Sequence, residues 1–184
     1  DLGQTALRIG KRVHSETGID RHGASVVSVA LDLAQDVTGA LSDRTALVVG
    51  AGAMSSLSLQ TLASRGVSDI TVASRTTAST KRAADLSGAT PIGMDELPGA
   101  LQKADVIVSA TGANGVVITA EDIATAMSGR PDRALVVVDL ALPHDTEPEV
   151  GAIRSVTRID LADLAHAPGA AASQSDLDVA RTLI

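Results

Sequence analysis

Along most of this chain, short runs of consecutive apolar residues alternate with longer segments in which apolar residues recur at helical spacing. Residues 46–49 form a continuous apolar run, which is typical of a strand buried on both faces of a parallel sheet. The segment that follows has apolar residues at helical spacing, from Met54 to Leu62. The same alternation continues downstream and predicts strands at residues 46–49, 69–73, 90–92, 105–110, 133–139 and 155–159.

Helices are predicted between these strands and before the first one. Ser25 is a suitable N-cap for a helix over residues 25–34, and the polar residues 14–21 before it predict a connection. Strands and helices that alternate in this way form right-handed crossovers. The fold class is therefore α/β, a doubly wound parallel sheet of the Rossmann NAD(P)-binding type with flanking helical segments. The other predicted helices cover residues 2–13, 53–65, 77–87, 95–103, 119–129, 160–165 and 175–184.

The composition narrows the classes of function. The 184 residues carry a net charge of −7, with 45% hydrophobic and 20% charged residues, and they include no cysteine. This is the composition of a globular protein, and its charge disfavours a non-specific grip on nucleic acid. No apolar run reaches the roughly 20 residues of a membrane helix, so we expect no membrane partner and a cytoplasmic location. Disulfides, thiolate metal sites and a cysteine nucleophile are excluded within this chain.

The turn after the first strand has the composition of a dinucleotide-binding loop. Gly50 permits a tight turn, and Gly52 lets the backbone approach a pyrophosphate, which the N–H groups at the start of the next helix attract. Ser55 occupies the third small position of the pattern. Glycine turns also occur in purely structural crossovers, but the strand–turn–helix context favours nucleotide binding. The residues expected to bind the nucleotide here are Gly50, Ala51, Gly52, Ala53, Met54 and Ser55.

The end of the second strand should distinguish NAD from NADP. An acidic residue there binds the ribose of NAD, whereas this chain has Ser74, Arg75 and Thr76, and no carboxylate between residues 72 and 84. Arg75 can stack on adenine and pair with a 2′-phosphate, and the two hydroxyls can hydrogen-bond it. A solvated arginine at a strand end is the plainer alternative. The position at the nucleotide edge predicts NADPH as the cofactor, bound by Ser74, Arg75, Thr76 and Lys81.

The turn after the fourth strand is made of small residues and lies at the same edge of the sheet. Thr111 and Gly112 would let the nicotinamide ribose approach the backbone, although a plain strand–helix turn has the same composition. His144 lies in a loop at this edge, and a lone histidine there is more typical of the surface than of an acid/base. The spacing of the histidines predicts no metal site. No catalytic residue can be assigned from spacing.

Several motifs, in order along residues 4–165, resemble those of the glutamyl-tRNA reductase family. Residues 10–19 (GKRVHSETGI) resemble that family's GKRVRTETxI, and residues 139–150 (DLALPHDTEPEV) resemble its DIAVPRDIDPxV. These two motifs are the more specific ones. Residues 49–54 (VGAGAM, similar to VGAGxM) and 74–76 (SRT, similar to NRT) resemble motifs that shikimate dehydrogenases share, and residues 109–112 (SATG) resemble the family's S[ST]TG.

This resemblance implies a role within a longer protein. In that family a cysteine of an N-terminal domain attacks the aminoacyl ester of glutamyl-tRNA, and NADPH reduces the thioester to glutamate-1-semialdehyde for porphyrin synthesis. The cysteine-free chain would then be inactive alone, within a homodimeric parent enzyme whose substrate is glutamyl-tRNA. Residues 1–22 would end the catalytic domain, 23–167 would bind NADP, and 168–184 would be a linker that begins a helical dimerisation domain. Ser55, in place of the family's usual glycine, would crowd the pyrophosphate slightly.

Two other functions remain open. A shikimate-type NADP-dependent dehydrogenase would need a substrate domain with a catalytic lysine–aspartate pair before the sheet, and residues 1–40 are too short to supply it. A non-catalytic, nucleotide-sensing Rossmann domain would have kept the sheet and lost the activity. A complete absence of NADP(H) and NAD(H) binding would favour a non-catalytic domain over either enzyme.

Overall fold

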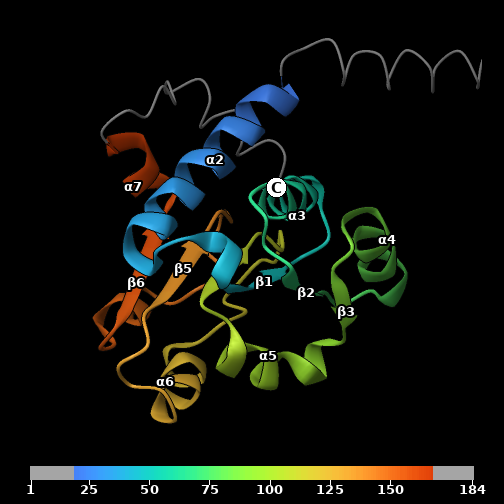
Figure 1. The fold of residues 1–184 in the computed structure, drawn as a ribbon. Helices are drawn as coiled ribbons and strands as arrows, with labels where there is room; N and C mark the ends of the chain where they lie inside the picture. The colour runs from blue at the N-terminus through green and yellow to red at the C-terminus, as the bar shows by residue number, and fades with distance from the viewer. Residues whose placement is uncertain (1–18, 168–184) are drawn as a thin grey trace, which may run out of the picture.

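A six-stranded parallel sheet forms the centre of the computed structural model, which describes residues 19–167 (Figure 1). The strand order is β3-β2-β1-β4-β5-β6, and every neighbouring pair is parallel. The chain thus runs from β1 to one edge of the sheet, returns beside β1, and runs to the other edge. The predicted doubly wound sheet is confirmed. Its strands are β1 (Thr45–Val49), β2 (Asp69–Ala73), β3 (Thr90–Ile92), β4 (Val106–Ser109), β5 (Leu135–Asp139) and β6 (Val156–Asp160).

Helices cover both faces of the sheet (Figure 1). Residues of α2 (Ile19–Thr38), α3 (Ala53–Ser64), α4 (Thr77–Ser87) and α7 (Leu161–His166) share one apolar cluster with the strands. Residues of α5 (Leu97–Lys103) and α6 (Ala120–Ser128) share a second cluster, on the other face. Alternate residues of each strand point to opposite faces, so β1 contributes Ala46 and Val48 to the first cluster and Leu47 and Val49 to the second.

Two helices begin at residues other than those predicted, and one short helix was not predicted. Helix α2 begins at Ile19, so residues 19–21 are helical rather than connecting and Ser25 is not an N-cap. From Val26 on, one apolar face of the helix, which includes Ala30 and Leu31, packs on the core. Helix α5 begins only at Leu97, after a 3₁₀ turn. The loop after β5 leads into a 3₁₀ helix, η3 (Pro148–Ala152). The predictions for residues 2–13, 14–18 and 175–184 lie outside the described residues.

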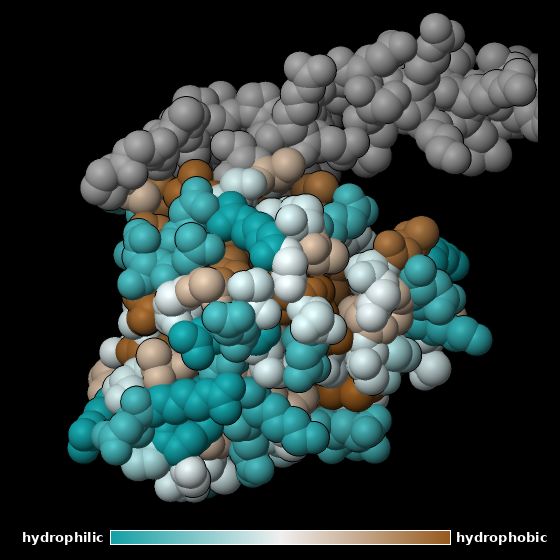
Figure 2. All heavy atoms as spheres, viewed as in Figure 1, coloured by the Kyte–Doolittle hydropathy of each residue, from teal (hydrophilic) through white to brown (hydrophobic). Residues whose placement is uncertain are grey.

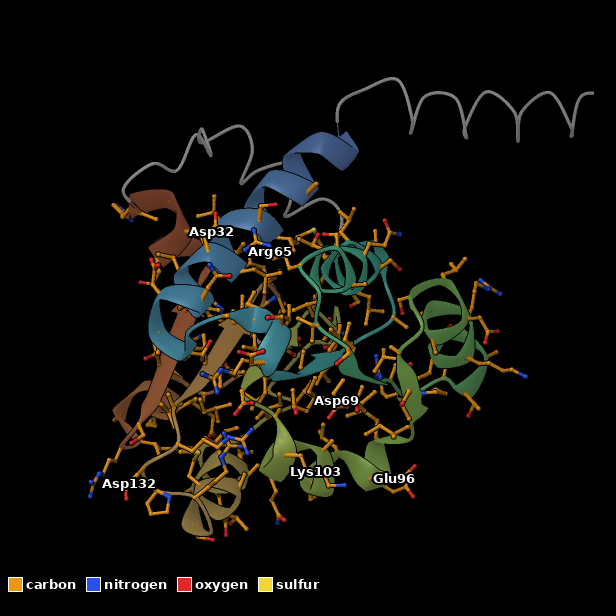
Figure 3. All side chains as sticks on the ribbon, in the orientation of Figure 1. Asp32, Arg65, Asp69, Glu96, Lys103 and Asp132 are labelled. Carbon is orange, nitrogen blue, oxygen red and sulfur yellow. The ribbon has the colours of Figure 1, made fainter. Side chains whose placement is uncertain are left out.

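An ion pair fastens α3 to the long helix α2. Arg65, at the C-terminus of α3, donates to the Asp32 carboxylate at 2.7 Å and to the Ser28 carbonyl oxygen at 3.0 Å (Figure 3). Gly66 follows with a φ of 82°, the left-handed conformation in which a glycine commonly ends a helix. The C-terminus of the helix that follows the glycine turn is therefore held on α2.

The surface of the described domain is mainly polar. On the face seen in Figure 2, hydrophilic and intermediate residues predominate and hydrophobic ones are dispersed. None of the helices within residues 19–167 combines the length and the apolar character needed to cross a membrane. The large hydrophobic side chains that are exposed are Val37, Leu86, Val116 and Leu142.

Candidate nucleotide site

A cavity of about 570 Å³ opens at the carboxyl ends of β1, β2 and β4. Strand order reverses at β1, which lies between β2 and β4, and doubly wound sheets bind their ligands at this switch point. The lining holds one cation, from Arg75, and no carboxylate. The lining residues are Gly50, Ala51, Gly52, Ser74, Arg75, Thr76, Ser79, Met94, Thr111, Ala113, Asn114, Gly115, Val116 and Val117.

The two glycines of the first turn have different physical roles. Gly50 has a φ of 117°, and a Cβ there would overlap the Ala110 carbonyl oxygen and lie 2.7 Å from the Ser55 hydroxyl oxygen. Gly52 has an ordinary φ of −84°, and a Cβ there would meet no atom within 4 Å. Gly50 is thus required by packing between β1 and β4, whereas Gly52 leaves open space beside the cavity, as an approaching pyrophosphate requires.

The start of α3 presents free amide groups beside this space. Gly52 is the N-cap and no side chain caps the helix, so its first N–H groups have no acceptor from the helix or a cap. Met54 and Ser55 are buried, and the Ser55 hydroxyl donates to the Ala110 carbonyl oxygen at 3.1 Å. Any contact of these two residues with a bound anion would therefore be made through the backbone. The Ser55 hydroxyl lies at the β1–β4 packing rather than in the lining.

The end of β2 brings hydroxyls and a guanidinium to the opposite wall. The Ser74 hydroxyl is hydrogen-bonded to the Thr80 hydroxyl and to the Thr76 carbonyl oxygen, which holds the turn into α4. Arg75 and Thr76 are exposed, and within residues 19–167 Arg75 has no ion-pair partner. Lys81 is exposed on α4 but does not line the cavity. Arg75 is thus available to an anionic ligand.

The structure brings most, but not all, of the predicted cofactor residues to the cavity. Those outside its lining are Ala53, Met54, Ser55, Lys81 and Gly112. Sequence reasoning missed Ser79, Met94 and residues 115–117. Met94 follows β3, so the rule that ligands bind at the carboxyl ends of strands could have found it. The place of residues 115–117 depends in addition on a contact with a distant part of the chain.

A buried polar network lies at the carboxyl ends of β5 and β6. Asp139, which is fully buried, accepts hydrogen bonds from the amides of Ala141 and Thr146 at 3.1 and 2.9 Å. Arg158 lies 3.4 Å from Asp139 and 2.9 Å from Asp160. His144 is half-exposed, outside the cavity lining, with Nδ1 3.7 Å from the Asp139 carboxylate. Within residues 19–167 no cluster of side chains suited to a metal ion occurs.

Ionisation of Asp160 follows from the same network. Burial disfavours the charged form, but hydrogen bonds from the Asp163 amide, from Arg158 and from the Ala162 amide outweigh it. The pKa of Asp160 is therefore lower than its ordinary value. Asp160 also caps α7, because its carboxylate accepts from the first free amides of that helix.

A family match, sequence relatives and solved structures all relate this chain to dehydrogenases and to glutamyl-tRNA reductase. Residues 32–167 match the family described as Shikimate / quinate 5-dehydrogenase. A glutamyl-tRNA reductase from Kineococcus radiotolerans is 44% identical over 183 residues, which cover 100% of this chain and 41% of that protein. The solved glutamyl-tRNA reductase from Methanopyrus kandleri is 34% identical, with a TM-score of 0.73, over 97% of this chain and 44% of that one.

More distant structures share the fold. Quinate dehydrogenase from Corynebacterium glutamicum in complex with NAD is 16% identical, with a TM-score of 0.58, over 74% of this chain and 50% of that one. The chain spans about two fifths of the length of the glutamyl-tRNA reductases it matches. These findings confirm the resemblance that the sequence motifs carry. The chain belongs to the shikimate / quinate 5-dehydrogenase family and is homologous to part of glutamyl-tRNA reductase.

Proposed function

We propose that this chain is the NADPH-binding domain of a glutamyl-tRNA reductase, which reduces glutamyl-tRNA to glutamate-1-semialdehyde. The observation that carries the proposal is the cavity at the strand-order switch, where the Gly50–Gly52 turn faces the β2 end that holds Arg75. The homology to glutamyl-tRNA reductase supports the choice of enzyme. NADPH would supply the hydride, and the residues of this chain would bind and orient it.

The pyrophosphate would lie against the glycine turn. The open space at Gly52 admits a group that a side chain would displace, and the uncapped start of α3 offers N–H donors to it. Two negative phosphates are favoured there by the helix dipole as well as by hydrogen bonding. This combination supports a dinucleotide rather than a neutral ligand.

The 2′-phosphate of NADPH would be held at the end of β2. Arg75 is exposed, has no ion-pair partner within residues 19–167, and lies in a lining that contains no carboxylate to repel the phosphate. A guanidinium binds phosphate with paired, charge-assisted hydrogen bonds. Ser74, Thr76 and Ser79 add hydroxyl donors to the same wall. These features support NADPH over NADH.

Other parts of the enzyme would complete the reaction. The chain has no cysteine, so the thioester step of this enzyme family needs a residue outside these 184. We therefore expect the isolated chain to bind nucleotide without reducing glutamyl-tRNA. We propose residues 23–167 as the nucleotide-binding domain, although α2 runs continuously across residue 22. The parent enzyme is proposed to be cytoplasmic and homodimeric.

Calorimetric titration with NADPH and with NADH tests the cofactor assignment. We expect NADPH to bind more tightly, and Arg75→Ala to reduce that preference by about 1–3 kcal/mol, the range of a charge-assisted contact. Arg82→Ala is the matched control, because Arg82 is an exposed arginine of α4 outside the cavity lining. Equal losses in both variants would contradict a specific role for Arg75. If neither nucleotide bound the wild-type chain, a non-catalytic domain would be favoured.

A further inference from the structure

One loop forms a large part of the cavity wall. Residues 110–119, between β4 and α6, form neither a helix nor a strand of the sheet. Ile118 at its end is buried in the core, but residues 111–116 are half-buried or exposed, so this part keeps one conformation only if hydrogen bonds hold it. Its cavity-lining residues are Thr111, Ala113, Asn114, Gly115, Val116 and Val117.

Asp145, from the loop after β5, contacts both ends of this wall. Its carboxylate accepts hydrogen bonds from the Thr111 amide at 2.8 Å, from the Thr111 hydroxyl, and from the Ser109 hydroxyl at 2.7 Å. Its carbonyl oxygen accepts from the Val117 and Ile118 amides at 2.7 and 2.9 Å. One residue therefore closes the loop over residues 111–118 at its start and at its end.

The Asp145 carboxylate depends on these donors as much as the loop depends on it. Asp145 is fully buried, and among residues 19–167 no cation lies within 4 Å of its carboxylate. An ionised carboxylate without a cation is tolerated in such a place only when N–H and O–H donors surround it. Its own backbone is fixed by Asp139, which accepts from the Asp145 amide at 3.3 Å and is paired with Arg158. Hydrogen bonds thus connect Asp139 of β5, through Asp145, to the loop that forms the cavity wall.

We propose that Asp145 is a positioning residue for nucleotide binding. It does not line the cavity and acts through Thr111 and Val117, which do. By holding both ends of the loop, it keeps the wall in the conformation that receives the ligand, so the ordering cost is removed before binding. The identity of the ligand, NADPH, rests on the proposed function, whereas the role of Asp145 in the loop does not.

Amide hydrogen exchange of the nucleotide-free protein, followed by NADPH titration, tests the proposal. Asp145→Ala removes the carboxylate contacts and keeps the carbonyl bonds to Val117 and Ile118, so we expect amide exchange to rise about tenfold or more chiefly at Thr111 and Ala113, at the start of residues 111–118, and NADPH affinity to fall about tenfold or more. Asp105→Ala is the matched control, because Asp105 is an equally buried carboxylate at the opposite end of β4. It should destabilise the domain without selectively loosening residues 111–118 or weakening NADPH binding.

Asp145→Asn provides a milder variant in case the alanine variant fails to fold. It keeps the shape but replaces one acceptor oxygen with a donor, so a smaller rise in loop exchange and a smaller loss of affinity are expected. The proposal is overturned if Asp145 and Asp105 variants weaken NADPH binding equally, or if exchange across residues 111–118 does not change. If wild-type protein binds neither NADPH nor NADH, the proposed function fails, and the exchange comparison still decides the role of Asp145.

Discussion

The two ends of β4 each hold a buried aspartate, but the chain satisfies them differently. At the amino end, Asp105 accepts from Arg133 at 2.6 Å, from Arg130 at 3.3 Å and from the Thr45 amide at 3.1 Å. At the carboxyl end, Asp145 is surrounded by hydroxyl and amide donors, most of them from a loop beside an open cavity. Asp105 is therefore satisfied by ion pairs with two arginines and has only a structural role. Asp145 is satisfied by donors of the loop, and by our proposal it holds that loop in place for a ligand.

The glycine turn beside the carboxyl end of β4 gives the largest expected change in stability, and it separates a packing residue from a ligand-binding one. Gly50→Ala would place a Cβ against the Ala110 carbonyl oxygen in a backbone conformation that disfavours side chains. We expect a loss of about 4 kcal/mol in the free energy of unfolding, from backbone strain and overpacking together. Gly52→Ala meets no atom within 4 Å and should leave stability almost unchanged. Urea unfolding followed by circular dichroism measures both.

Nucleotide titration completes the comparison of the two glycines. Gly52→Ala is expected to weaken NADPH binding about tenfold or more, because the methyl group would occupy the space that the pyrophosphate needs. A variant that is stable and binds normally would show that the open space at Gly52 has no part in binding. Stable, tight-binding Gly50→Ala would contradict the packing role of Gly50.

The amino end of β4 gives the next largest expected change. Asp105→Ala would leave the partly buried Arg130 and its neighbour Arg133 without their carboxylate, and we expect a loss of about 3 kcal/mol in the free energy of unfolding. Burial and the charge of Arg133 already lower the pKa of Arg130, whereas Asp105 opposes this effect. Removal of Asp105 therefore destabilises the charged guanidinium further. Thermal unfolding measures the loss. If Asp105→Ala also lowered NADPH affinity, the two ends of β4 would not differ in function as we propose.

The sequence predicted the sheet and the first half of the site because both depend on local patterns. Apolar runs mark strands buried on both faces, and the positions of Gly50 and Arg75 after two such runs place them at one edge. The place of residues 115–117 in the wall could not be predicted, since the loop is held by Asp145, which lies 34 residues after its partner Thr111. The start of α2 was missed because Ser25, a suitable N-cap by residue type, lies inside the helix, which begins at Ile19.

The smallest expected effect concerns acid stability at the end of β6. The pKa of Asp160 is lowered, so its charged form stabilises the fold at pH values above its unfolded pKa of about 3.9, and this contribution is lost as the pH falls through the folded pKa. Asp160→Asn keeps a capping oxygen for α7 but loses the ion pair with Arg158. We expect Asp160→Asn to lower the free energy of unfolding by about 1 kcal/mol at neutral pH. We expect no difference once the Asp160 carboxyl group is protonated in both the folded and the unfolded protein.

Urea unfolding of wild-type and Asp160→Asn proteins between pH 7 and pH 3 measures how the stability difference begins to narrow as the pH falls below the unfolded pKa. Asp132→Asn is the control, because Asp132 and its partner Arg154 are both about four-fifths exposed and their pair, at the amino end of the sheet, should contribute little at any pH (Figure 3). A stability difference for Asp160→Asn that stayed constant down to pH 3 would contradict the assignment. The loss would then come from the shape of the side chain, and the carboxyl edge would depend on hydrogen-bond geometry rather than on charge.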